Sequence, residues 1–140
     1  MERATIKWTG RQEFLARTPS DHTFTFDAGG EHSTGPSPME ILLPALGACT
    51  ASDVVTILQK KRQPLEGLEV EISGERAADP PRVWTRIEVV YRLRGNLDEK
   101  AVRDAIDLSE KKYCSVSAML QKTARITFRH EISKAQPAEK

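Results

Sequence analysis

Two cysteines, Cys49 and Cys114, are the residues of this 140-residue chain that most clearly could do chemistry. Cys49 lies inside an uncharged segment, and Cys114 follows Lys111 and Lys112 at the junction of two predicted helices. A helix that begins there with Ser115 as its N-cap would place the Cys114 sulfur beside exposed N–H groups, which favours a thiolate. The two lysines add positive charge nearby. From these residues alone, two interpretations stay open: a redox-active pair, or two inert thiols that act as small hydrophobes.

The other residues that could carry chemistry match no further catalytic or metal-binding pattern. The sequence contains no Cys-x-x-Cys, and the spacing of His22, His32 and His130 fits no metal site, so we expect neither a bound metal nor a cofactor. Strand parity makes His130 a hydrogen-bonded core residue. Asp53 follows Cys49 by four residues and therefore shares its helix face. It could orient a polar partner or mark where the helix emerges into solvent, and we favour the second interpretation.

Composition and charge indicate an ordinary globular protein. Hydrophobic residues make up 39% of the chain and charged residues 29%, and 21 Lys and Arg against 20 Asp and Glu give a net charge of +1. This balance argues against nucleic-acid and acidic-membrane partners. The N-terminus lacks the apolar core of a secretory signal, and no uninterrupted apolar stretch approaches the ~20 residues of a membrane span. We therefore expect a cytoplasmic protein, where structural disulfides are uncommon.

A long uncharged helix must position the first cysteine. Ser37 and Glu40 have the spacing of a capping box, and Pro38 falls at the first helical position, so the sequence predicts a helix from there to about residue 61. The twelve residues between Glu40 and Asp53 carry no charge. A helix that is apolar on every face must be covered on every face. Either a second subunit supplies part of the cover, or the helix is buried within one protomer.

Strands and shorter helices make up the rest of the predicted fold. Strands are expected over residues 4–10, 14–17 and 22–27, where they form an antiparallel meander, and over residues 68–73, 83–93 and 125–132. Helices are expected over about 96–112, capped by Asn96, and about 115–123. Strand groups are separate from the helices, which is typical of an α+β fold with mostly antiparallel sheets. We expect one domain over residues 1–132 and a polar tail over 133–140.

Two cysteine-centred segments resemble the OsmC/Ohr family of hydroperoxide-reducing proteins. Residues 35–49 resemble its central-helix motif, as Gly-Pro-Ser-Pro-Met-Glu-Ile-Leu-Leu-Pro-Ala-Leu-Gly-Ala-Cys. Residues 112–117, Lys-Tyr-Cys-Ser-Val-Ser, are a variant of its second-cysteine segment, Cys-Pro-Val-Ser. Within the family, the sequence most resembles the YhfA-type branch, through the Ser-Pro-Met-Glu run, residues 53–60 and residues 107–109. The resemblance covers essentially residues 5–132.

The resemblance implies an OsmC-like fold, in which antiparallel sheets of an intertwined homodimer wrap long central helices. It also implies a thiol-dependent peroxidase acting on organic hydroperoxides or hydrogen peroxide, and reset by a dithiol reductant. Cys49 is then the peroxidatic cysteine and Cys114 the resolving cysteine, at the dimer interface. The alternative is a non-catalytic dimeric protein on the same fold, which binds a small hydrophobic ligand or senses redox state.

Two further site residues are implied by the resemblance. The family's peroxidases use an Arg from the N-terminal region to hold the thiolate and the peroxide; Arg11 and Arg17 are candidates, and we assign Arg17. Those enzymes also place a Glu directly after the Pro that opens the helix. Here Met39 follows Pro38 and Glu40 comes one place later, a rotation of ~100° on a helix. We assign Glu40 to the site; its other interpretation is the capping box alone.

Overall fold

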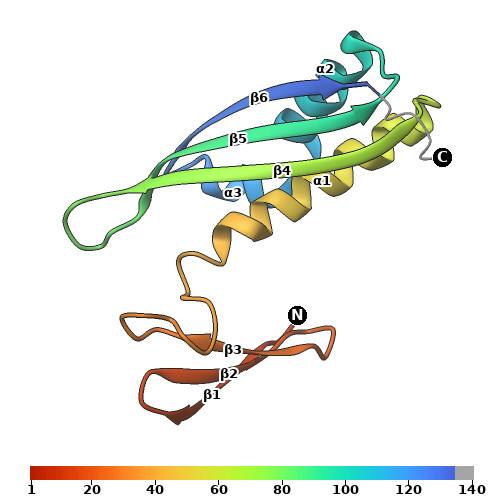
Figure 1. Ribbon diagram of the computed structural model, residues 1–140. Helices are drawn as coiled ribbons and strands as arrows, with labels where there is room; N and C mark the ends of the chain where they lie inside the picture. Colours follow the sequence, from red (N-terminus) through yellow and green to blue (C-terminus); the bar gives the residue numbers. More distant parts are fainter. Residues whose placement is uncertain (135–140) are drawn as a thin grey trace, which may run out of the picture. The chain divides into compact units, whose positions relative to one another are not determined.

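The computed structural model describes residues 1–134, and the chain divides into two compact units, Met1–Leu42 and the remainder from Leu43. The first unit is a three-stranded antiparallel meander in the order β1 (Thr5–Gly10), β2 (Glu13–Arg17) and β3 (Thr23–Asp27) (Figure 1). All three strands were predicted from their apolar and β-branched residues.

The second unit is built on a sheet in the order β4 (Leu65–Arg76), β5 (Trp84–Gly95) and β6 (Arg125–Ser133). β4 and β5 pair antiparallel, whereas β5 and β6 pair parallel. A parallel pair needs a crossover connection, and this one contains α2 (Glu99–Leu108), a π-helical turn (Ser109–Tyr113) and α3 (Ser115–Leu120). The α+β prediction is confirmed, with one parallel strand pair. The predicted tail begins inside β6 at Ser133, and its residues 135–140 lie outside the described part.

The long helix α1 (Leu42–Lys60) runs along this sheet (Figure 1). Its fully buried side chains Leu46, Val54 and Leu58 share one hydrophobic core with β5 and α2. On β5 the predicted alternation is confirmed, because Ile87, Val89, Tyr91 and Leu93 all point into this core. Among the described helices α1 alone is long and apolar enough to cross a membrane. The core helix of a globular protein passes the same test by length and composition, and one face of α1 packs in the core of this unit.

The predicted start of α1 at Pro38 is wrong by four residues, since the helix begins at Leu42. The capping-box contacts do form: the Ser37 hydroxyl donates to the Glu40 carboxylate at 2.7 Å and accepts from the Glu40 N–H at 3.4 Å. They close a turn rather than a helix. Pro44 gives the reason, because it has no N–H to donate to the residue 40 carbonyl and is tolerated only in a first helical turn. A helix that contains Pro44 therefore starts near residue 42.

The predicted cap of α2 is also displaced. Asp98, rather than Asn96, is the N-cap, and its carboxylate accepts a hydrogen bond from the Ala101 N–H at 3.0 Å. A carboxylate at this position satisfies an otherwise unpaired N–H and faces the positive end of the helix dipole. The predicted long helix over 96–112 is therefore shorter, ending at Leu108, where the π-helical turn begins.

Replacing Gly95 with alanine is expected to destabilise the second unit by at least about 2 kcal/mol. Gly95 has φ +142°, and a Cβ there would clash with the carbonyl oxygen of Pro64. Backbone atoms on the neighbouring segment have little room to move aside. Denaturant unfolding measures the change, and Gly30→Ala is the control, because a Cβ at Gly30 meets nothing within 4 Å. Equal unfolding midpoints for Gly95→Ala and Gly30→Ala would contradict this prediction.

Candidate active site

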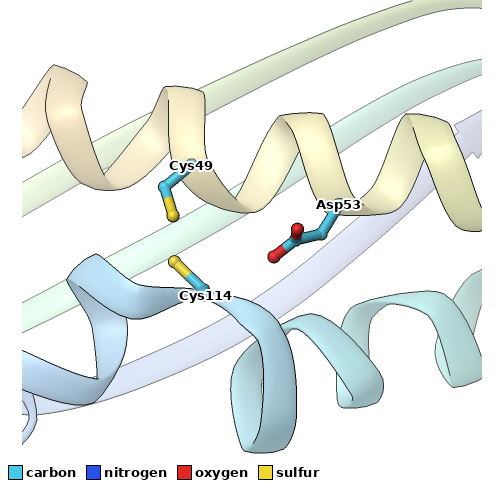
Figure 2. A group of neighbouring side chains, drawn as sticks. All are labelled: Cys49, Asp53 and Cys114. Carbon is cyan, nitrogen blue, oxygen red and sulfur yellow. The ribbon is translucent and has the colours of Figure 1, made fainter.

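The two cysteines, 65 positions apart in the chain, lie side by side in the second unit. Cys49 projects from α1, and Cys114 projects from the connection between the π-helical turn and α3 (Figure 2). The two sulfur atoms and a carboxylate oxygen of Asp53 all lie within 4.8 Å of one another. Asp53 shares the helix face of Cys49, as its spacing of four residues predicts. The structure thus brings together three of the polar groups singled out in the sequence.

The local fold fixes the position of Cys114. The Cys114 N–H donates to the Ser109 carbonyl at 2.8 Å, which closes the π-helical turn, and the residue itself is extended, with φ −75° and ψ 103°. Its sulfur then accepts a hydrogen bond from the Ser117 N–H at 3.3 Å. Cys114 is therefore the N-cap of α3, and the prediction of Ser115 in that role is wrong. The sulfur takes the acceptor position that an oxygen usually fills.

The surroundings of Cys114 favour its protonated form. Only 3% of the residue is exposed, and burial, the hydrogen bond with Cys49 and the charge of Asp53 together raise the pKa of the Cys114 thiol to about 11. The hydrogen bond from the Ser117 N–H lowers that pKa but is outweighed. The predicted thiolate at Cys114 is thus wrong. Neither lysine is among the causes that shift this pKa, and the Lys112 ammonium lies over the Tyr113 ring, 5.3 Å from its centroid.

Alkylation of Cys114 is expected to be slow at neutral pH and to accelerate only as pH rises toward about 11. The reason is that the thiolate reacts and a raised pKa reduces the thiolate fraction at every lower pH. Peptide mass spectrometry after timed iodoacetamide treatment measures the rate at this residue. The control is the same chain in denaturant, where the thiol should titrate close to the ordinary value of 9.0. A folded-state midpoint at or below the unfolded one would refute the assignment.

A row of buried hydroxyl groups leads from the sheet to Asp53. The Tyr91 hydroxyl lies 2.6 Å from Thr50 Oγ1, and Thr50 Oγ1 lies 2.8 Å from Ser109 Oγ. Ser109 Oγ then donates to the Asp53 carboxylate at 2.9 Å. Tyr91, Thr50 and Ser109 are fully buried, and burial raises the pKa of Tyr91. The favoured interpretation of Asp53, a mere point of emergence into solvent, is therefore wrong; this carboxylate has a built-in polar partner.

Sequence reasoning missed these three hydroxyl residues. Tyr91 sits in an alternating strand pattern in which any large side chain would serve as core. Thr50 is adjacent to Cys49, but adjacent helix positions face different directions, so nothing linked it to the cysteine. The available signal was Asp53 itself, because it is the first charge after the uncharged stretch of α1 and shares the helix face of Cys49. Ser109 is a donor that only the folded chain supplies.

Cys49, Cys114 and Asp53 also offer atoms that a metal ion could bind, namely two sulfurs and one carboxylate oxygen. A metal binds cysteine as thiolate, and the buried thiol of Cys114 would first have to lose its proton. This chemistry suits a dithiol better than a metal site, and a metal-free site remains our prediction. His130 contributes no ligand to the group; its Nε2 pairs with the Glu99 carboxylate at 2.6 Å. The predicted hydrogen bond is therefore confirmed, whereas the predicted core position is not, because the side chain is 18% exposed.

A pocket of about 410 Å³ adjoins the carboxylate side of the site. Its lining combines charged, apolar and aromatic side chains: Asp53, Thr56, Ile57, Lys60, Lys61, Leu108 and Tyr113. Asp53 thus faces both the thiols and a space large enough for a small organic molecule.

The two other predicted site residues, Arg17 and Glu40, belong to the first unit. The Arg17 guanidinium donates to the Asp21 carboxylate. Glu40 is paired with Ser37, whose hydroxyl and N–H hydrogen bonds lower the pKa of the Glu40 carboxyl. The capping-box interpretation of Glu40 therefore has a structural basis. The roles of Arg17 and Glu40 beside the thiols remain predictions.

Comparison with known proteins defines the family. The sequence model described as OsmC-like protein matches residues 29–129. Protein YhfA of Escherichia coli strain K12 is 42% identical over 130 residues, which cover 92% of this chain and 96% of YhfA. The chain therefore belongs to the OsmC-like family, as the two cysteine segments predicted, and is similar to YhfA over nearly its whole length.

Solved structures show the same fold. A hypothetical protein from Aquifex aeolicus VF5 is 31% identical and superimposes with a TM-score of 0.87 over 97% of this chain and 98% of its own. The organic hydroperoxide resistance protein OhrB of Bacillus subtilis is 12% identical, with a TM-score of 0.65 over 92% of this chain and 96% of OhrB. At that identity the likeness to OhrB demonstrates the fold alone.

Proposed function

We propose that this protein is a thiol-dependent peroxidase that reduces organic hydroperoxides or hydrogen peroxide, with Cys49 as peroxidatic and Cys114 as resolving cysteine. The observation that carries the proposal is the placement of two thiols from distant segments within 4.8 Å of each other. Membership of the OsmC-like family supports it, as does the fold shared with a protein named for organic hydroperoxide resistance.

The chemistry balances with these two thiols. The Cys49 thiolate attacks the peroxide O–O bond, takes up the terminal hydroxyl as a sulfenic acid and releases the remaining oxygen as an alcoholate, which picks up a proton. The Cys114 sulfur then attacks the Cys49 sulfur, the sulfenic oxygen leaves as water, and a disulfide forms. A dithiol reductant restores both thiols by exchange.

The different exposure of the two cysteines supports the proposed order. Cys49 is partly exposed, whereas Cys114 is buried and protonated. A peroxide from solvent meets Cys49 first, and a thiol held back from reaction until a sulfenic acid forms beside it suits the resolving step. Arg17 is our candidate for the cation that holds the Cys49 thiolate and the peroxide, with Glu40 as the acid that orients the guanidinium.

A homodimer accounts for apolar surface that the single chain leaves exposed. Ala45 and Ala48 on α1 are exposed, and so are Ile6 and Trp8 on β1, at 60% and 66%. Uncharged surface of this kind on a small domain is usually covered by a partner. One protomer therefore does not cover α1 on every face. Of the two interpretations drawn from the sequence, we propose the one in which a second subunit supplies part of the cover. Two cysteines used as reduced thiols fit a cytoplasmic location.

Purified protein supplied with cumene hydroperoxide and a dithiol should consume the peroxide catalytically, at a rate proportional to protein concentration. A rate equal to that of the dithiol alone would overturn the peroxidase proposal. It would favour the alternative, a dimeric small-ligand-binding or redox-sensing protein, for which the pocket of about 410 Å³ beside Asp53 is the supporting observation.

A further inference from the structure

The buried hydroxyl row has a defined direction. Each hydroxyl has a single hydrogen to donate, and an ionised carboxylate only accepts. Because Ser109 donates to Asp53, its bond with Thr50 requires Thr50 to be the donor. Thr50 must then accept from Tyr91. Three protons therefore point along the row toward the Asp53 carboxylate, and hydrogen bonds aligned in this way strengthen one another.

The row immobilises a carboxylate next to two thiols. One Asp53 oxygen accepts the Ser109 hydrogen bond at 2.9 Å, and the side chain points at the pair of sulfurs (Figure 2). In the resting protein, a carboxylate beside a buried thiol makes the thiol harder to ionise, since two negative charges would then lie close together. The same carboxylate can accept that proton while the sulfur is forming a bond and no longer keeps the charge.

We propose that Asp53 is the general base of the resolving step, held in place by Ser109, Thr50 and Tyr91. As Cys114 attacks the sulfur of the Cys49 sulfenic acid, Asp53 takes the Cys114 proton and passes it to the departing hydroxide, which leaves as water. One S–S bond and one O–H bond form, one S–O bond and one S–H bond break, and Asp53 is unchanged at the end. This inference deepens the proposed peroxidase function and rests on it for the identity of the natural step.

The charged and titratable groups around Asp53 are compatible with this role. The two thiols face it across the site, and Lys60, Lys61 and Tyr113 line the adjoining pocket with it. Lys61 is engaged elsewhere, because its ammonium lies 3.6 Å from the Asp104 carboxylate. Asp53 is thus the carboxylate that the described structure places within 4.8 Å of both sulfurs.

The resolving step can be measured without a peroxide. Cys49 attacks a chromogenic aromatic disulfide and releases one coloured thiolate; attack by Cys114 on the resulting mixed disulfide then releases a second. Asp53→Asn should slow the second release by about 100-fold near neutral pH, because the base is lost. The slowed rate should recover as pH rises, since the thiol then ionises without help, and recovery should begin below the wild-type pKa of about 11 because the variant lacks the Asp53 charge that helps to raise it. A purely structural defect would not recover in this way.

Three matched variants complete the experiment. Asp107→Asn removes an exposed carboxylate from α2 and should leave both releases unchanged. Asp53→Glu should restore part of the second rate, and Ser109→Ala, which frees the base without removing it, should slow the step less than Asp53→Asn. An unchanged second release in Asp53→Asn, or one that stays slow at high pH, would overturn the proposal. If the wild type consumes no peroxide yet shows this pattern, the peroxidase function fails while the role of Asp53 stands.

Discussion

Cys49→Ser should abolish hydroperoxide consumption, lowering the rate by at least ~1,000-fold to that of the dithiol reductant alone. A serine hydroxyl fits the space of the thiol but is far less acidic and far less nucleophilic toward oxygen, so neither sulfenic acid nor disulfide can form. Cys114 is a poor substitute, because it is buried and its pKa is raised to about 11. Peroxide loss, followed colorimetrically over a range of protein concentrations, measures the effect.

The control for this substitution is a measurement of stability, which shows whether the variant is folded. The Cys49 side chain is only partly buried, so the serine variant should unfold at nearly the same denaturant concentration as the wild type. Equal peroxide consumption by the wild type and a folded Cys49→Ser protein would show that the chemistry lies elsewhere.

Cys114→Ser should separate the first chemical step from the second. Without a resolving thiol, the Cys49 sulfenic acid formed by one equivalent of peroxide persists, and turnover with the dithiol falls by about 10-fold or more, because the reductant must reach Cys49 directly. Intact-mass measurement should show one added oxygen per chain, and a sulfenic-acid-specific nucleophile should trap it at Cys49. In the wild type the same treatment should give no trapped adduct.

Two outcomes would count against the assignment of Cys114. One is undiminished turnover in the variant, which would mean that the second thiol is dispensable. The other is failure of the added oxygen to appear while peroxide is still consumed, which would place the oxidised atom on some other residue.

The sequence predicted the architecture well where the signal is periodic. The alternation along residues 83–93 correctly placed Ile87, Val89 and Tyr91 on one core-facing side. It could not show that β6 would pair parallel to β5, because the alternation shows which face of the sheet a residue occupies and not the direction in which the neighbouring strand runs. The helix start at Pro38 failed for a local reason: Pro44 lies six positions on, and its missing N–H limits where the helix begins.

The candidate site was predictable in its sulfur atoms and not in its surroundings. Cys49 and Cys114 were paired through the resemblance of their segments, and the structure brings them together. The expectation of a thiolate at Cys114 failed because it used only neighbours in the sequence, the flanking lysines and a helix N-terminus. The pKa of Cys114 is raised chiefly by burial, which depends on segments that pack against it in the folded chain. Thr50 and Ser109 were invisible for a related reason, since each meets its hydrogen-bond partners only across the folded core.

The central claim is that the two thiols react with each other, and one measurement tests it most directly. Reduced wild-type protein is treated with a single equivalent of hydroperoxide and no reductant, then alkylated, digested without reduction and mapped by mass spectrometry. The account predicts a peptide pair joined by a disulfide between Cys49 and Cys114, with the loss of two hydrogens per chain. A chain oxidised at Cys49 with Cys114 still alkylatable as a thiol would contradict it.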